Sequence, residues 1–200
     1  MKLEVKSVLI GVVAILAIAV TSTLFGTTST RGETISYALA EIEDEEPVIV
    51  VRLDDHIENA KQIKCLAENI YHEARGESRK GMIAVAYVTL NRARRGEFPN
   101  SICDVVYEAR TYVNWKGNVM PKKYQCQFTW FCDGLPDTIN TTSTSWKESL
   151  TVAVDVFNNN VNDPTNGATH YYNHNIVKPK WSHQLAMTTR IENHTFHRLR

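Results

Sequence analysis

The stretch NIYHEARGE, residues 69–77, holds the side chains of this chain that are best suited to acid–base chemistry. Glu73 lies in an apolar, helix-like run that ends at Gly76, and a second glutamate, Glu77, follows directly. The negative end of a helix and burial against an apolar neighbour both favour the protonated form of a carboxyl group. We therefore expect Glu73 to keep a proton near neutral pH. A protonated carboxyl in a cleft can protonate the leaving oxygen when a glycosidic bond is cleaved.

Two other interpretations of these glutamates stay open. A glutamate near the end of a helix is usually a solvated surface charge, which would give Glu73 no chemical role. Glu77, four residues further on, is either a helper that raises the pKa of Glu73 by repulsion or a structural cap of the next helix.

A metal site is a further alternative, because His72-Glu73 begins like the metalloprotease motif H-E-x-x-H. Gly76 stands where that motif needs its second histidine, so we expect no metal and no cofactor at this place. His72 is then a structural residue or part of a cleft wall. The C-terminal third is rich in histidine, which keeps a zinc-dependent amidase or peptidase as an alternative; these residues are His170, His174, His183, His194 and His197.

Hydrophobic spacing predicts the helices that position these groups. Apolar residues recur at i, i+3, i+4 and i+7 through residues 60–75, which predicts an amphipathic helix that stops at Gly76. Ser78 can cap a second helix over residues 79–94, and its middle, GMIAVAYVTL, is apolar nearly all round, as in a core helix. Further along, the pattern predicts a short helix capped at Asn100 or Ser101, loops with a hairpin at 111–134, a helix from Ser143 or Ser145 to Phe157, and strands at 168–174 and 186–199. The expected fold class is α+β, mostly helical, with a small sheet.

The N-terminus predicts export. Lys2 and Lys6 precede an uncharged apolar stretch, residues 8–25, which is long enough for a signal anchor and follows a short cytoplasmic N-terminus, residues 1–7. A cleavable signal peptide is the alternative, but Ala38-Leu39-Ala40 is far downstream. Residues 26–59 resemble a linker, with a β-branched patch, VIVV at 48–51, that could dock as an edge strand. Residues 60–200 form the expected domain, placed in the periplasm or extracytoplasmic space and tethered to the cytoplasmic membrane.

The amino-acid composition limits the kinds of partner that this chain is expected to bind. The chain has 22 basic and 22 acidic residues, so no overall charge draws it toward nucleic acid. Export makes disulfides the expected state of the four cysteines. Cys126 and Cys132 could close a small loop and leave Cys65 with Cys103, which is one of three connectivities. Buried free thiols are the alternative.

Residues 65–92, CLAENIYHEARGESRKGMIAVAYVTLNR, resemble the core motif of the SleB/CwlJ cell wall hydrolases. This is the spore cortex-lytic type, which also occurs among bacteriophage lysis proteins. The resemblance continues through FPNSICDVVY, QFTW, the helix near 146–157 and GATHYYN, with Pro179 and Trp181 beyond, and it covers nearly all of residues 63–199.

The resemblance implies a lysozyme-like fold and cleavage of peptidoglycan between N-acetylmuramic acid and N-acetylglucosamine, as a muramidase or lytic transglycosylase. It also implies that Glu73 is the catalytic acid/base. Sugar rings pack on aromatic side chains and their acetamido groups bind amides, so we expect the substrate to contact Gln127, Phe128, Trp130, Thr169, His170, Tyr171 and Tyr172. Strand alternation means that Tyr171 and Tyr172 cannot both face the cleft. The expected partners are peptidoglycan and the membrane, with the chain acting as a monomer in host lysis or wall remodelling. A non-catalytic wall-binding protein is a further alternative.

Overall fold

The computed structural model describes residues 53–200. The cytoplasmic N-terminus, the predicted signal anchor at 8–25, the VIVV patch and most of the predicted linker lie outside the described residues. Within residues 53–200, none of the helices has both the length and the apolar character of a membrane span.

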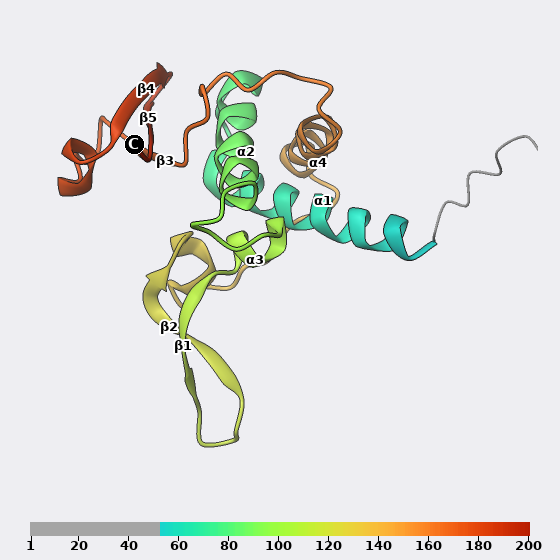
Figure 1. Ribbon diagram of the computed structural model, residues 1–200. Helices are drawn as coiled ribbons and strands as arrows, with labels where there is room; N and C mark the ends of the chain where they lie inside the picture. Colours follow the sequence, from blue (N-terminus) through green and yellow to red (C-terminus); the bar gives the residue numbers. More distant parts are fainter. Residues whose placement is uncertain (1–52) are drawn as a thin grey trace, which may run out of the picture. The chain divides into compact units, whose positions relative to one another are not determined.

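Four α-helices and five strands make up the described part (Figure 1). In chain order the elements are α1 (Leu53–Ala74), α2 (Arg79–Ala93), α3 (Ile102–Val106), β1 (Ala109–Val113), β2 (Val119–Cys126), the 3-10 helix η1 (Thr129–Cys132), α4 (Thr144–Phe157), β3 (His170–Asn173), the 3-10 helix η2 (Lys180–His183), β4 (Ala186–Ile191) and β5 (His194–Arg198). The α+β prediction with helices leading is confirmed.

Helix α1 begins at Leu53, seven residues before the expected start at residue 60. The first turns are exposed, so they contribute nothing to the apolar stripe from which the start was inferred. Asp54 and Asp55 lie in the first turn, where acidic side chains interact favourably with the helix dipole. Residues 53–59 therefore belong to the helix and not to the linker.

Helix α2 lies between two layers of the fold, which explains why it has no polar face. Its residues Val85 and Leu90 join the core formed with α1, α3 and α4. Ala84 and Val88 of the same helix pack against Ile191 and Phe196 of the C-terminal sheet. Burial on both sides confirms the prediction of a core helix.

The turn between α1 and α2 fixes where α1 ends. Gly76 has φ +92°, a left-handed conformation that glycine adopts without strain. Ser78 then caps α2, since its hydroxyl accepts a hydrogen bond from the backbone N–H of Gly81 at 3.4 Å. This turn places Glu73 in the last turn of α1, as the sequence predicts.

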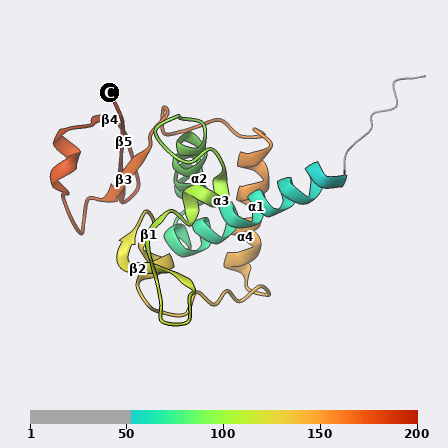
Figure 2. The same ribbon diagram turned by 60° about the horizontal axis from the view of Figure 1, so that its bottom comes forward.

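Two small antiparallel sheets complete the fold. Strands β3, β5 and β4 form a three-stranded sheet in that order, and Tyr171 of β3 pairs with Phe196 of the central strand β5. Strands β1 and β2 form a hairpin that extends away from the helices in the views of Figures 1 and 2. The predicted hairpin and C-terminal strands are confirmed.

Both disulfides of the expected connectivity form. Cys65 of α1 is bonded to Cys103 of α3, and Cys126 at the end of β2 is bonded to Cys132 of η1. The first joins two core helices and the second fixes the base of the hairpin. No cysteine is free.

Candidate active site

Glu73 is held between two elements that are far apart in the sequence. The phenol of Tyr171, on β3, donates a hydrogen bond to Oε2 of Glu73 at 2.7 Å. Burial raises the pKa of Glu73, while the Tyr171 hydrogen bond and the positive charge of Arg92 act in the opposite direction. The net effect favours a proton on Glu73, as expected for a general acid.

Tyr171 is a proton donor in this pair and not a base. Burial, the nearby charge of Glu73 and the hydrogen bond to it all raise the pKa of Tyr171 well above its ordinary value. The phenol therefore keeps its proton and turns one carboxyl oxygen of Glu73 into an acceptor. The other oxygen, Oε1, is the atom that remains for proton transfer.

Arg92 supplies a buried positive charge beside Glu73. It lies near the C-terminus of α2, is 6% exposed, and donates from Nε to the carbonyl oxygen of Thr169 at 2.7 Å. Its guanidinium lies over the rings of Phe98 and Phe128, 5.5 and 5.2 Å from the ring centroids. Burial lowers the pKa of Arg92, and Tyr171, Glu108 and Glu73 partly offset this. The charge can stabilise the carboxylate that forms when Glu73 gives up its proton.

His72 packs on the predicted aromatic wall. Its ring stacks on Trp130 with 4.3 Å between ring centroids, and burial lowers the pKa of His72, so the ring is neutral at neutral pH. The indole N–H of Trp130 donates to Asn69, and Asn69 donates to Thr89 of α2, each at 3.0 Å. These contacts fix Trp130 and the ring of His72 beside the last turn of α1.

Glu77 interacts with the strand turn at Glu192. Hydrogen bonding with Glu192 and then burial raise the pKa of Glu77. Glu192 also accepts hydrogen bonds from the backbone N–H and the hydroxyl of Ser78. A Cβ atom at Gly81 would come within 2.8 Å of a Glu192 oxygen, so this corner is tightly packed. Glu77 is not among the groups that shift the pKa of Glu73, and its position favours the structural interpretation.

The other predicted substrate-binding residues divide into buried and accessible groups. Phe128 is 3% exposed and Thr169 is 0% exposed, so neither side chain is placed to contact a polymer. Phe128 instead supports Arg92, and the Thr169 carbonyl accepts from it. Burial in this structure does not favour direct substrate contact for these two residues, for which it stays a prediction. Composition alone did not show which aromatic and polar residues the core would bury.

The alternation predicted for β3 is observed. Tyr171 reaches Glu73, whereas Tyr172 packs on His197 and Trp181 with ring centroids 5.6 and 5.8 Å away. His170 is half-buried near Trp181, and burial followed by the charges of Arg92 and His197 lowers the pKa of His170 to about 4. His170 is therefore neutral and unsuited to supply a proton at neutral pH.

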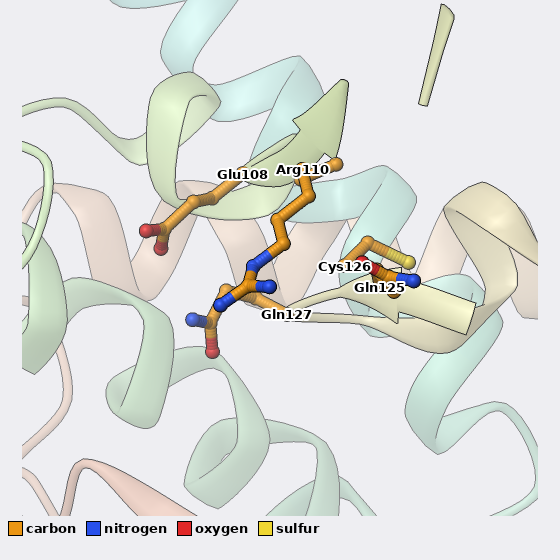
Figure 3. A pocket seen from close by; sticks show the side chains of 6 residues that line it. Glu108, Arg110, Gln125, Cys126 and Gln127 are labelled. Carbon is orange, nitrogen blue, oxygen red and sulfur yellow. The ribbon is translucent and has the colours of Figure 1, made fainter. Parts of the chain in front are cut away.

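Gln127 lines a cavity of about 550 Å³ at the base of the hairpin (Figure 3). The other lining residues are Glu108, Ala109, Arg110, Gln125 and Cys126. Glu73 does not line this cavity, so the structure brings Gln127 to a neighbouring site and not to the acid itself.

Within residues 53–200, no group of three or more His, Cys, Asp and Glu side chains is arranged to hold a metal ion. His170 and His174, close in sequence, instead contact Thr169 and Thr195 through Nδ1 at 3.0 and 3.2 Å.

Three residues around the site were not anticipated from the sequence. Arg92 and Asn69 lie in stretches that look like ordinary helix, and Glu108 follows a short helix without any motif. One feature of the sequence could have indicated Arg92. It is a charged residue near the end of an otherwise apolar core helix, and a buried charge needs partners.

Comparisons with known proteins show which family this chain resembles. The profile of the family described as Cell Wall Hydrolase matches residues 76–197, a range that begins three residues after Glu73. The spore cortex-lytic enzyme of Bacillus cereus is 29% identical over 134 residues, which cover 67% of this chain and 43% of that protein. The spore cortex-lytic enzyme of Halalkalibacterium halodurans is 29% identical over 138 residues, which cover 67% of this chain and 34% of that protein. This chain thus matches less than half the length of these curated relatives.

Two solved structures match most of their own length. The catalytic domain of the germination-specific lytic transglycosylase SleB from Bacillus anthracis is 29% identical with a TM-score of 0.50, covering 68% of this chain and 93% of that domain. The catalytic domain of the Bacillus cereus SleB protein is 28% identical with a TM-score of 0.52, and the match covers 70% of this chain and 91% of that domain. With a family profile that spans residues 76–197, this chain belongs to the cell wall hydrolase family.

Proposed function

We propose that this chain cleaves the glycan strand of peptidoglycan as a lytic transglycosylase, at the bond between N-acetylmuramic acid and N-acetylglucosamine. Glu73 is the general acid and then the general base. Two relatives support this proposal: the SleB domain from Bacillus anthracis is described as a lytic transglycosylase, and the curated relatives are described as spore cortex-lytic enzymes.

The reaction needs one carboxyl group that works twice. Glu73 donates its proton to the glycosidic oxygen as the bond from that oxygen to C1 of the muramic acid breaks. The C6 hydroxyl of the same sugar then forms a bond to C1, and its proton goes to the Glu73 carboxylate. The products are a free sugar hydroxyl and a 1,6-anhydromuramic acid end, and the enzyme regains its starting protonation state without water.

One observation carries the choice of this mechanism. Hydrolysis by the usual glycosidase route uses two carboxyl groups flanking the bond, about 5–9.5 Å apart. The side-chain partners that the structure gives Glu73 are the hydroxyl of Tyr171 and the positive charge of Arg92, and neither is a carboxylate. This arrangement supports a mechanism in which Glu73 is the acid and then the base, with an internal hydroxyl in place of an activated water.

Mass spectrometry of the soluble products from purified sacculi tests the proposal. We expect anhydromuramic acid ends, with a mass lower by one water than the corresponding reducing ends. Reducing muramic acid ends would indicate a hydrolase, and free peptides with intact glycan would indicate an amidase. Either result would refute the transglycosylase proposal.

We also infer that residues 8–25 anchor the chain in the cytoplasmic membrane, with the domain outside the cytoplasm where peptidoglycan lies. The uncharged apolar stretch after Lys2 and Lys6 supports this orientation. Its Thr- and Ser-containing end resembles the anchors of phage endolysins that later leave the bilayer, which fits a role in host lysis. Wall remodelling by a bacterial enzyme is the competing role.

Cell fractionation distinguishes an anchored chain from an exported soluble one. The full chain should sediment with membranes and be digested by protease added to spheroplasts, while a chain with residues 8–25 deleted should stay in the cytoplasm. A full chain found soluble, at a mass reduced by cleavage near residue 40, would show a cleaved signal peptide instead.

A further inference from the structure

Four polar residues line the cavity at the base of the hairpin. Ala109 of β1 pairs with Cys126 of β2, and the backbone N–H of Gln127 donates to the carbonyl oxygen of Glu108 at 3.0 Å. The pairing register shifts directly after Ala109, so the strands are irregular at this place. The residues on either side of the pair, Glu108, Arg110, Gln125 and Gln127, all line the cavity (Figure 3).

Two of these side chains, Glu108 and Arg110, carry opposite charges and take part in none of the ion pairs found within residues 53–200, although Arg92 lies in electrostatic range of Glu108. Oε2 of Glu108 is buried and has no hydrogen-bond partner within residues 53–200. Arg110 is exposed and takes part in none of the ion pairs found in those residues. A buried carboxylate oxygen without a donor is destabilising, so a ligand that brings a donor here would bind favourably.

We propose that this cavity binds a zwitterionic amino-acid group, with a free ammonium and a free carboxylate, of the peptide stems attached to the glycan strand. This inference rests on the proposed function, because it takes peptidoglycan as the substrate. The ammonium donates to Glu108, the carboxylate accepts from the guanidinium fork of Arg110, and the amides of Gln125 and Gln127 bind the adjoining peptide group. The volume of about 550 Å³ is in the range of small-molecule sites, about 300–1,000 Å³.

The pair of opposite charges selects against simpler ligands. A lone anion would be attracted by Arg110 but repelled by Glu108, and a lone cation would meet the reverse. The hydroxyls of an uncharged sugar can hydrogen-bond to both side chains, but a sugar brings no charge opposite to either of them. A group with both charges matches the cavity, whose four polar side chains have no net charge.

Arg92 relates the cavity to Glu73. It is in electrostatic range of both Glu73 and Glu108, one of the residues that line the cavity. A stem held in the cavity would therefore position the glycan strand relative to Glu73. Arg110 and Glu108 act here as positioning residues for the substrate.

Binding to sacculi tests this inference independently of cleavage. The full chain carrying Glu73→Gln is sedimented with three preparations: intact sacculi, sacculi stripped of peptides by an amidase, and intact sacculi whose free amines have been acetylated. We expect an apparent Kd about tenfold lower for intact sacculi than for either other preparation. Adding Arg110→Gln should remove this tenfold preference, and adding Glu108→Gln should make binding insensitive to acetylation.

Lys122→Gln is the matched control, since it removes one positive charge from an exposed position of the same hairpin that does not line the cavity. It should keep the tenfold preference for intact sacculi. Equal binding of the three preparations, or equal weakening by Arg110→Gln on intact and stripped sacculi, would overturn the inference. If Glu108→Gln does not fold, the acetylation comparison with Glu108 intact still decides. A failed cleavage proposal would show instead in the product masses, and not in this binding preference.

Discussion

At the scale of single residues, Glu73 is controlled by opposing influences. Burial favours its protonated form, while Tyr171 and Arg92 favour the carboxylate. A group used as acid and then as base needs access to both forms, and this balance provides it. The contacts come from α1, α2 and β3, so a residue's neighbours in sequence do not reveal them.

The buried carboxyl of Glu73 should make folding stability depend on pH. Because its folded pKa is raised above the ordinary value, the native state binds the proton more tightly than the unfolded state. Its favourable contribution is therefore complete below the unfolded pKa and is lost as pH rises through the folded pKa. We expect Glu73→Gln to be more stable than the original chain near pH 8, with a smaller difference near pH 4.

Thermal unfolding at the two pH values measures this difference. Glu148→Gln, which changes an exposed carboxyl of α4, is the control and should show little effect at either pH. A stabilisation by Glu73→Gln that is the same at both pH values would contradict the account.

Removing the Tyr171 hydroxyl should shift the pH profile of cleavage. The hydrogen bond at 2.7 Å lowers the pKa of Glu73, so Tyr171→Phe should raise that pKa further. The acid must be protonated to act, and the alkaline limb of the kcat/KM profile should move to higher pH. Tyr172→Phe, on the opposite face of β3, should leave the limb in place. An unchanged or downward-shifted limb in Tyr171→Phe would count against the pairing.

The sequence predicted Glu73 itself but not all of its surroundings. Its position at the end of a helix followed from the apolar period and Gly76, and the alternation of Tyr171 and Tyr172 followed from strand geometry. The burial of Phe128 and Thr169, and the role of Arg92, depend on long-range packing between α2 and the sheet. Local patterns carry no information about such contacts.

At the scale of elements, the turn from α1 to α2 positions Glu73, the proposed acid. Ser78 caps α2 through Gly81 and also bonds to Glu192 near the start of β5. We expect Ser78→Ala to cost about 1 kcal/mol of unfolding free energy, the usual loss for a capping hydroxyl. Urea denaturation measures this loss, and Ser78→Thr, which keeps a hydroxyl, should recover most of it. Equal losses in both variants would show that the cap is not the cause.

The two disulfides should contribute unequally to stability. Cys65–Cys103 closes a loop with a sequence separation of 38, and Cys126–Cys132 one of only 6. Chain-entropy arguments give about 4 kcal/mol for the first and about 2 kcal/mol for the second. Denaturant unfolding of the two double Cys→Ala variants should therefore show a greater loss for the first pair. A greater loss for the second would indicate that the hairpin base, and not chain entropy, dominates.

Capping residues, glycines and hydrophobic periods predicted most element boundaries. The start of α1 was missed because its first turns are exposed and carry no apolar stripe. The sequence offered two candidate N-cap residues for α3 and two for α4. In the structure, Ser101 caps α3 and Ser143 caps α4.

At the scale of the whole described part, α2 links the two halves of the fold. Packing of α2 on α1, α3 and α4 on one side and on the sheet on the other brings Glu73 and Tyr171 together across 98 positions of sequence. The apolar surface of α2 predicted that it would be central. Which element would cover each side could not be predicted, because all the candidate partners have similar apolar faces.

The central claim is that Glu73 performs the chemistry, and one comparison tests it most directly. The release of soluble glycan fragments from sacculi is measured for the original chain and for Glu73→Gln, with Glu148→Gln as control and circular dichroism to verify folding. We predict that Glu73→Gln stays folded and loses at least about 100-fold of the activity, as for loss of a general acid, while the control keeps it. A folded Glu73→Gln variant that releases fragments at the original rate would contradict the account.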